Sequence, residues 1–293
     1  MAISAAQVKE LRERTGLGMM ECKAALTETD GNMEAAIDLL RKKAGAKVDK
    51  KAHRVAAEGV VAVRVDADGQ VGALVEVNSE TDFVAKEERF VAFAEALAAL
   101  VVEKNPADLE ALLALNYPGG GTVAEARAAL VAQFGENMSV RRFARLKAEG
   151  GVLGHYIHGR RIGVLVSLTG GDPAVARDLA MHVAANKPAY ARPDEVPSDV
   201  VAREKAIYVA QAAESGKPAD IVEKMVMGKV RKYLEDVTLV GQPFVKDPEI
   251  TVATYLKRSG ADVKRFFRLE VGEGIEREVS NFASEVMSQV KGS

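Results

Sequence analysis

Apolar residues at helical spacing predict a small helical module at the N-terminus. The pattern runs through residues 8–15 until the glycine-rich segment 16–18 interrupts it. A second helix is expected over about 19–26, and the turn at 30–32 leads into a third. We therefore expect residues 1–55 to form a three-helix module followed by a basic linker.

A pattern of strands and helices occurs twice in the rest of the chain. The segment 59–94 aligns with 151–185, with a turn one residue shorter in the second copy. The runs 139–146 and 262–269 also match, and each is suited to a third strand. Each copy is thus expected to contain a hairpin, a helix, an inserted helical stretch and a returning strand.

This order of elements predicts an α+β fold with a duplicated core. Each subdomain should have a small antiparallel sheet covered by helices on one face, with boundaries at 56–148 and 149–275. Within the second, two apolar stripes predict a helical hairpin over about 197–239 whose stripe is partly exposed. A C-terminal helix is expected within 276–293.

The junction between strand and helix in the first copy carries an acid and an aromatic ring. Thr81 is the expected N-cap, and Asp82 would complement the positive end of the helix dipole. Capping does not explain Phe83, although its spacing from Phe90 would also suit a core position. In the second copy Ala174 takes the place of Phe83. Since the same junction is built without a ring, the comparison favours a functional role for Phe83.

Adjacent methionines follow the glycine turn of the N-terminal module. Met19 and Met20 have soft, unbranched side chains that suit an adaptable contact surface. Neighbouring helical positions cannot share a face, so we expect one of them in the core and the other available to a partner helix.

Composition sets limits on the class of protein. The formal charge of -2 over 293 residues gives no global electrostatic reason to expect a nucleic acid or an acidic membrane as partner. Cys22 is the only cysteine, which indicates a reducing compartment. The first residues match neither a secretory nor a transit segment, and no apolar run reaches membrane-spanning length. We expect a cytoplasmic protein without a membrane partner.

Two basic features leave an RNA-binding translation or ribosome-associated factor as the alternative. One is the run of lysines and arginines within 41–54, and the other is the arginines that alternate along the third strands, 139–146 and 262–269. A solvated helix and a solvated sheet face are the more economical interpretations, because no aromatic side chains interleave with the basic linker.

Patterns typical of catalysis and cofactor binding are weak. The segments 119–121 and 215–217 lack the context of phosphate-binding loops. His155 and His158 have no acid or cysteine at ligand spacing, and His182 is expected to be a packed histidine. We expect no catalytic residues, no metal and no cofactor. His158 remains of interest because it lies in the tight turn of a hairpin, where it can reach a partner.

Four segments resemble the bacterial elongation factor Ts family of translation factors. They are residues 15–26, 81–86, 181–185 and 241–245, and they occur in order over essentially the whole chain. Leu17, where alanine is more usual, is a departure with local consequences only.

The resemblance implies a guanine-nucleotide exchange factor for elongation factor Tu, which acts by binding and does not bind the nucleotide itself. By similarity, Asp82 and Phe83, flanked by Thr81 and Val84, would enter the GTPase domain and disrupt its magnesium and phosphate site.

The resemblance also implies that the first module is similar to a ubiquitin-associated (UBA) domain. It implies further contacts with the partner as well. Met19, Met20 and Lys23 would contact the GTPase domain, as would the C-terminal helix, and His158 and Val245 would be further contact residues. The helical hairpin corresponds to a protruding coiled coil linked to dimerisation in some members, so it is a candidate surface for a homodimer.

Overall fold

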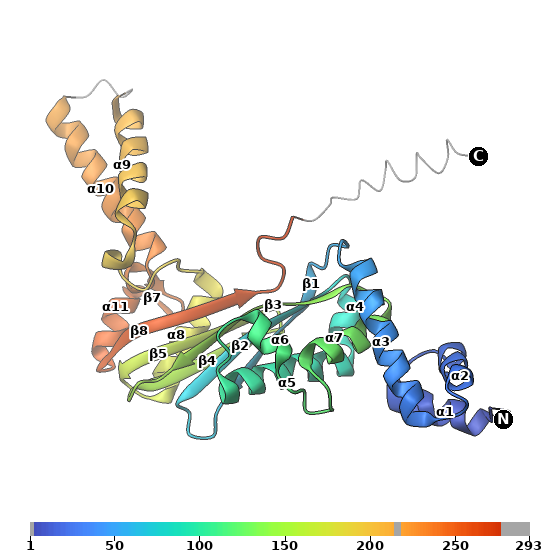
Figure 1. Ribbon diagram of the computed structural model, residues 1–293. Coiled ribbons are helices and arrows are strands. Elements are labelled where there is room, and N and C mark those ends of the chain that lie inside the picture. Colours follow the sequence, from blue (N-terminus) through green and yellow to red (C-terminus); the bar gives the residue numbers. More distant parts are fainter. Residues whose placement is uncertain (1–2, 214–217, 277–293) are drawn as a thin grey trace, which may run out of the picture.

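The N-terminal part of the protein is a bundle of three helices. The computed structural model describes residues 3–213 and 218–276 (Figure 1). The helices are α1 (Ala5–Thr15), α2 (Met19–Glu28) and α3 (Met33–Lys51). Ser4 and Gln7 form a capping box at the start of α1, and Gly16 ends that helix in the left-handed conformation. The predicted helices are thus correct, and α3 extends through most of the basic run.

The first sheet has the order β1-β2-β3 and is antiparallel. Its strands are β1 (Glu58–Val65), β2 (Val71–Ser79) and β3 (Met138–Lys147). Four helices connect β2 to β3: α4 (Asp82–Lys86), α5 (Glu88–Lys104), α6 (Leu109–Ala114) and α7 (Val123–Phe134). Helix α5 packs Phe90, Phe93 and Leu97 against one face of this sheet.

The second sheet has the order β4-β5-β8, also antiparallel. Its strands are β4 (Val152–His158), β5 (Ile162–Gly170) and β8 (Ala261–Glu270). The connection from β5 to β8 contains α8 (Pro173–Asn186), η1 (Pro193–Glu195), α9 (Ser198–Ala213), α10 (Ala219–Val237), η2 (Leu239–Gly241), β6 (Pro243–Phe244), β7 (Asp247–Thr251) and α11 (Val252–Arg258). Together the helices and the antiparallel sheets make an α+β fold.

The two sheets share an irregularity at aligned positions. In the first, the register between β2 and β3 shifts between Glu76 and Val77. In the second, the register between β5 and β8 shifts between Ser167 and Leu168, which are the aligned residues. In each sheet the extra residue lies on the third strand, Arg141 in β3 and Lys264 in β8, so the two copies share this irregularity.

The two sheets pack face to face, and each covers the face of the other that lies opposite its helices. Val61 and Leu74 of the first sheet form a buried cluster with Leu165 and Leu269 of the second. A Cβ atom on Gly163 would lie 2.5 Å from Val61 Cγ1, which shows how closely the strands approach. The expectation of a solvated sheet face opposite the helices is therefore wrong. The sequence pattern of one sheet carries no information about a second sheet that covers it.

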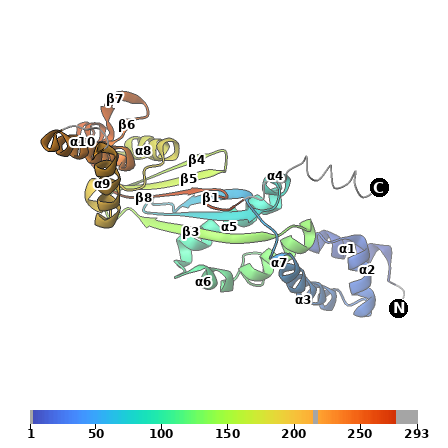
Figure 2. The ribbon, with the colours of Figure 1, turned by 90° about the horizontal axis from the view of Figure 1, so that it is seen from above.

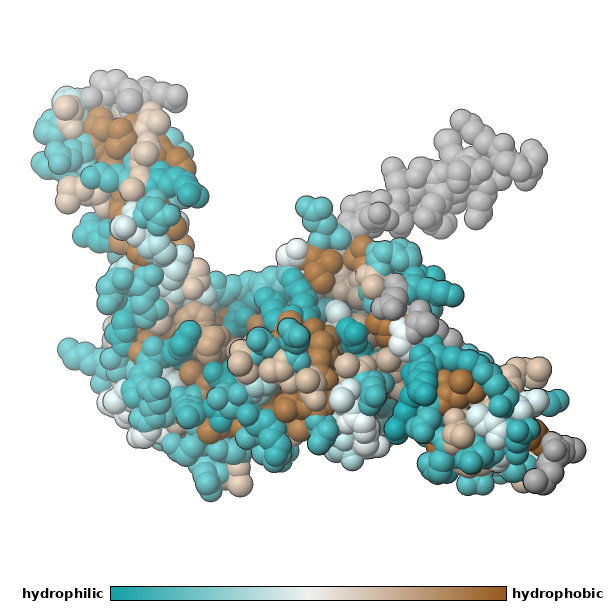
Figure 3. Space-filling model, in the orientation of Figure 1, coloured by the Kyte–Doolittle hydropathy of each residue, from teal (hydrophilic) through white to brown (hydrophobic). Residues whose placement is uncertain are grey.

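Helices α9 and α10 form the predicted hairpin and project from the body (Figures 1 and 2). Brown apolar side chains occur along this projection in Figure 3. Those with large exposed side chains are Ile207, Val209, Ile221 and Met227. The partly exposed stripe is thus confirmed.

The predicted C-terminal helix lies outside the described residues. Across residues 3–213 and 218–276, no helix is both long and apolar enough to cross a membrane.

Candidate functional site

The turn after β2 presents Asp82 and Phe83 on a short capped helix. Thr81 has an extended backbone, and its hydroxyl accepts a hydrogen bond from Val84 N at 3.4 Å, so the predicted N-cap is confirmed. Helix α4 ends at Glu87, whose backbone is again extended, and α5 begins at the next residue. The structure thus has two helices here, where a single one was expected.

The side chain of Phe83 is 77% exposed. The core interpretation of this ring is wrong, because the neighbouring Val84 and Ala85 are the α4 residues that pack into the first core. Val84 anchors the helix to the body and offers little surface to a partner. The short helix therefore buries one side and holds Phe83 out on the other.

Asp82 is exposed and paired with a lysine one turn later. Lys86 Nζ lies 2.5 Å from Asp82 Oδ2 and 6.0 Å from the centroid of the Phe83 ring. The hydrogen bond from Lys86 lowers the pKa of Asp82, so the carboxylate is charged at neutral pH. An exposed pair of this kind contributes little to stability, and Asp82 can exchange Lys86 for another partner at small cost.

The aligned junction in the second sheet is built differently. Asp172 caps α8 by accepting hydrogen bonds from Ala174 N at 2.8 Å and Val175 N at 2.9 Å. Gly170 and Gly171, which precede the cap, both have left-handed backbones. Ala174 is exposed at the place of Phe83. A ring is therefore not needed for a helix to begin here.

In the N-terminal module both methionines point into solvent. Met19 is 58% and Met20 is 75% exposed, and Lys23 is exposed as well. The expectation that one methionine is in the core is wrong, because Leu17, just before α2, fills that place beside Cys22. The start of α2 is thus an exposed surface of two thioethers and an ammonium group.

His158 lies at the tip of the β4–β5 hairpin, where the turn holds Gly159 and Arg160 with positive φ. The His158 side chain is exposed, and its Nδ1 lies 3.3 Å from Tyr156 Oη. The tip is anchored to the first sheet, because Arg160 O accepts from Val61 N at 2.7 Å. Since the start of β1 pairs with the end of β2, His158 and the Thr81 turn lie at the same end of the paired sheets.

Val245 follows β6 and is 40% exposed. Its N–H donates to His182 Nδ1 at 3.1 Å, so the His182 Nε2–H donates to Gln242 Oε1 at 2.9 Å. Burial lowers the pKa of His182, which agrees with a neutral ring. The expectation of a packed histidine is confirmed, and the ring holds the backbone from which Val245 projects.

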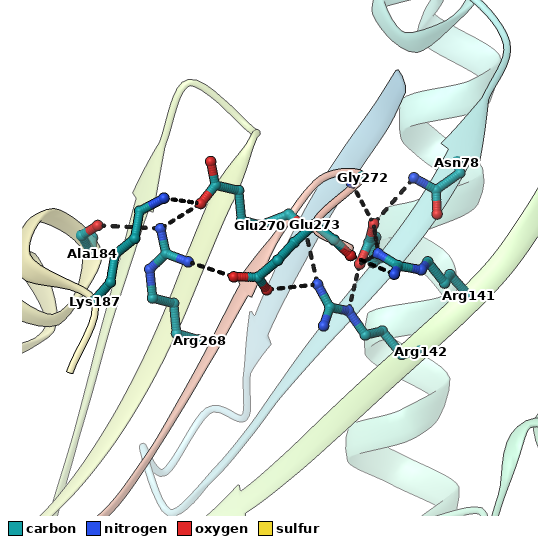
Figure 4. A network of polar contacts seen from close by, with 10 residues as sticks. Asn78, Arg141, Arg142, Ala184, Lys187, Arg268, Glu270, Gly272 and Glu273 are labelled. Atoms are coloured by element: carbon teal, nitrogen blue, oxygen red, sulfur yellow. Dashed lines mark hydrogen bonds and ion pairs between the residues drawn. The ribbon is translucent and has the colours of Figure 1, made fainter. Parts of the chain in front are cut away.

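The arginines of the third strands make internal contacts. Arg142 Nε lies 2.6 Å and Arg141 Nη1 lies 3.1 Å from the fully buried carboxylate of Glu76 (Figure 4). Arg145 donates to Val102 O, and Arg268 to Glu270. These contacts explain Arg141, Arg142, Arg145 and Arg268 without RNA, and for these four the expected solvated position is wrong, whereas Arg265 in β8 is exposed.

Burial raises the pKa of Glu76, but hydrogen bonds from Gly272 N, Arg142 and Asn78 outweigh it and leave the pKa below its usual value. The Gly272 N–H, directly after β8, donates to Glu76 Oε1 at 2.8 Å. Sequence reasoning missed Glu76, although a single acid within an apolar strand was a signal.

Across residues 3–213 and 218–276, no group of three or more His, Cys, Asp or Glu side chains is placed to hold an ion. The exposed apolar and charged side chains instead lie on firmly anchored turns and helix ends. This arrangement is typical of a protein that acts by binding another macromolecule.

Comparison with known proteins identifies the family. Residues 80–273 match the family model described as elongation factor TS. The chain is 57% identical to elongation factor Ts of Alkalilimnicola ehrlichii and 58% identical to that of Thioalkalivibrio sulfidiphilus, in each case over the full length of both chains. It is 56% identical, again over both full lengths, to elongation factor Ts of Methylococcus capsulatus. The chain belongs to the elongation factor Ts family of translation elongation factors.

Proposed function

We propose that this protein is a guanine-nucleotide exchange factor that binds elongation factor Tu in its GDP form and promotes release of the GDP. It acts by binding, without catalytic residues, cofactor or nucleotide site of its own. Membership of the elongation factor Ts family supports the partner. The observation that carries the mechanism is the exposed Phe83 ring on a capped helix that is anchored beneath it.

Exchange is a competition between two ligands of the GTPase. A protein that binds the nucleotide-free GTPase more tightly than it binds the GDP form must weaken the affinity of the GTPase for GDP. The ratio of the two affinities is the same in both directions. Full burial of the Phe83 ring would contribute about 1.5–3 kcal/mol, enough for at least a tenfold change in an equilibrium constant. Asp82 would leave Lys86 and bring a negative charge next to the magnesium and phosphate site, where it competes for their partners.

The remaining exposed groups form the wider interface in this proposal. Met19, Met20 and Lys23 give the start of α2 an adaptable apolar surface with a positive charge, suited to a helix of the GTPase domain. His158 lies at the same end as the Phe83 turn and would touch the same domain. Val245 projects from the second subdomain, after β6, and would contact a different domain of the GTPase.

The layout of the chain completes the proposal. We divide the chain at 1–55, 56–148, 149–275 and 276–293, with a UBA-like first module and two core subdomains that arose by duplication. The exposed stripe on α9 and α10 is an apolar surface that a second copy of the chain could cover as a coiled-coil homodimer. We place the protein in the cytoplasm, where translation takes place.

Release of a fluorescent GDP analogue from elongation factor Tu of the same organism tests the function. With excess unlabelled GDP, substoichiometric amounts of the protein should accelerate the release, and gel filtration should show a complex with the nucleotide-free GTPase. The isolated protein should retain no GDP. Unchanged release at saturating protein would reject the exchange function. Salt-dependent retention of RNA without any effect on release would favour the RNA-binding alternative instead.

A further inference from the structure

The Phe83 turn is hydrogen-bonded to the loop that joins α7 to β3. Glu136 in this loop accepts two hydrogen bonds from Thr81, one from its N–H at 3.0 Å and one from its hydroxyl at 2.6 Å. The same hydroxyl accepts from Val84 N, so the Glu136 carboxylate orients the group that caps α4. A carboxylate that accepts two hydrogen bonds holds its donors more firmly than a neutral acceptor does.

The residues on either side of Thr81 and Glu136 are bonded as well. Ser79 Oγ donates to Thr81 O at 2.9 Å, and Glu80 Oε1 accepts from Asn137 N at 2.6 Å. Asn137 Nδ2 in turn donates to Arg54 O at 2.7 Å, beyond the end of α3. The Phe83 turn is therefore held by hydrogen bonds to the loop that precedes β3, and through Asn137 to the linker of the N-terminal module.

The second copy shows that this support is not a requirement of the fold. Two residues before Ala261, the aligned position of Glu136 is Ser259, whose hydroxyl donates to Tyr255 O at 3.0 Å, at the end of its own helix. The aligned positions of Ser79 and Glu80 are Gly170 and Gly171. The copy with the exposed ring has a polar frame of hydrogen-bonded residues, made by Ser79, Glu80, Thr81, Glu136 and Asn137. The copy with the exposed alanine has two glycines and a serine at the positions aligned with Ser79, Glu80 and Glu136.

We propose that Glu136 is a positioning residue for exchange, which holds Thr81 so that Phe83 is presented to the GTPase in one orientation. This inference rests on the proposed function. A ring that must enter a narrow space between two elements loses much of its effect when its backbone is free to move, because small displacements of a positioned group carry large costs in rate. Glu136 acts through Phe83 and is not expected to touch the nucleotide.

The test compares the maximal rate of GDP release with the concentration that gives half of that rate. Glu136→Ala should lower the maximal rate about tenfold, since both acceptors of the Thr81 bonds are lost, and change the half-saturating concentration by less than about threefold. Glu136→Gln keeps one acceptor and should fall between Glu136→Ala and the wild type. Ser259→Ala, at the aligned position, is the matched control and should exchange at the wild-type rate.

A double-mutant cycle separates positioning from a general effect on structure. If Glu136 acts through Phe83, Glu136→Ala combined with Phe83→Ala should be no slower than Phe83→Ala alone, within about twofold. Wild-type rates for Glu136→Ala, or multiplication of the two effects, would overturn the positioning role and leave the exchange function standing. Wild-type exchange by Phe83→Ala would overturn both the positioning role and the part assigned to Phe83, with the exchange function itself left standing. If Glu136→Ala does not fold, Glu136→Gln serves in the same cycle, with thermal unfolding as the check.

Discussion

The two aligned junctions of this protein begin a helix in different ways. At the second, Asp172 caps the helix after two left-handed glycines, and the following side chains are small. At the first, Thr81 caps a five-residue helix, and Ser79, Glu80 and Glu136 make side-chain hydrogen bonds around it. Both solutions stabilise a helix start. The difference shows that the exposed Phe83 and its polar frame are additions to the fold and not conditions for it.

A second contrast occurs on the two central strands, opposite the register shifts of the third strands. Glu76 is fully buried and binds two arginines of β3 and the N–H of Gly272. The aligned Ser167 has one hydrogen bond, to Ala148 O at 3.5 Å. Because Gly272 follows β8, its hydrogen bond to the Glu76 carboxylate joins the first sheet to the chain that leaves the second. Since Ala148 follows β3, both residues join one sheet to the chain that leaves the other, but Glu76 does so with a charged group that has several donors.

The largest effect on stability should follow from removing this connection. Glu76→Ala leaves two arginines without their buried partner and should lower the free energy of unfolding by about 2–4 kcal/mol. The estimate is below that for a wholly buried pair because the Arg141 and Arg142 side chains are 25% and 32% exposed and can regain water. Ser167→Ala, the aligned control, should cost about 1 kcal/mol or less. Urea unfolding measures both, and equal losses would remove the contrast.

A smaller effect is expected from protonation of Glu76. The pKa of Glu76 is lower in the folded protein than in the unfolded chain. At acidic pH the unfolded state therefore binds more protons than the folded state, and acid favours unfolding. The associated stability is complete above the pKa of an unfolded glutamate, about 4.3, and is lost as the pH falls through the folded pKa. Unfolding midpoints between pH 7 and pH 3 should decline more steeply for the wild type than for Glu76→Gln. Parallel profiles would show that other carboxylates dominate.

The smallest effect should come from adding a ring to the second junction. Ala174→Phe places an aromatic side chain at an exposed position and should change the free energy of unfolding by about 0.5 kcal/mol or less. Exchange should be unaffected, because this turn lacks the polar frame of the first. Faster GDP release with Ala174→Phe would mean that any exposed ring on this protein can act, which contradicts a role specific to the Phe83 turn.

Local patterns predicted the elements of this fold well. The capping box at Ser4, the three N-terminal helices and the α9–α10 hairpin follow from spacing within a few turns of chain, where the responsible interactions are also local. The exposure of Phe83 was inferred from the internal copy, which supplied a second solution to the same junction. A single copy would have left the core interpretation open.

Features that depend on distant contacts were missed. The solvated face expected for Arg141 and Arg142 is occupied by a second sheet and by Glu76, 65 residues from Arg141. The support of Thr81 by Glu136 spans 55 residues and leaves no periodic trace in the sequence. The break between α4 and α5 depends on the backbone of Glu87 and was not visible in a continuous apolar pattern. Such contacts require the three-dimensional arrangement.

Stopped-flow release of fluorescent GDP from elongation factor Tu by Phe83→Ala tests the central claim most directly. The protein should be used at saturating concentration, with Ala174→Phe and the wild type measured in parallel and with unfolding midpoints as a check on the fold. Because the ring is exposed in the free protein, its removal should leave the fold intact and slow the stimulated release more than tenfold, in line with the roughly 1.5–3 kcal/mol of a buried ring. Stimulated release at the wild-type rate would contradict the account.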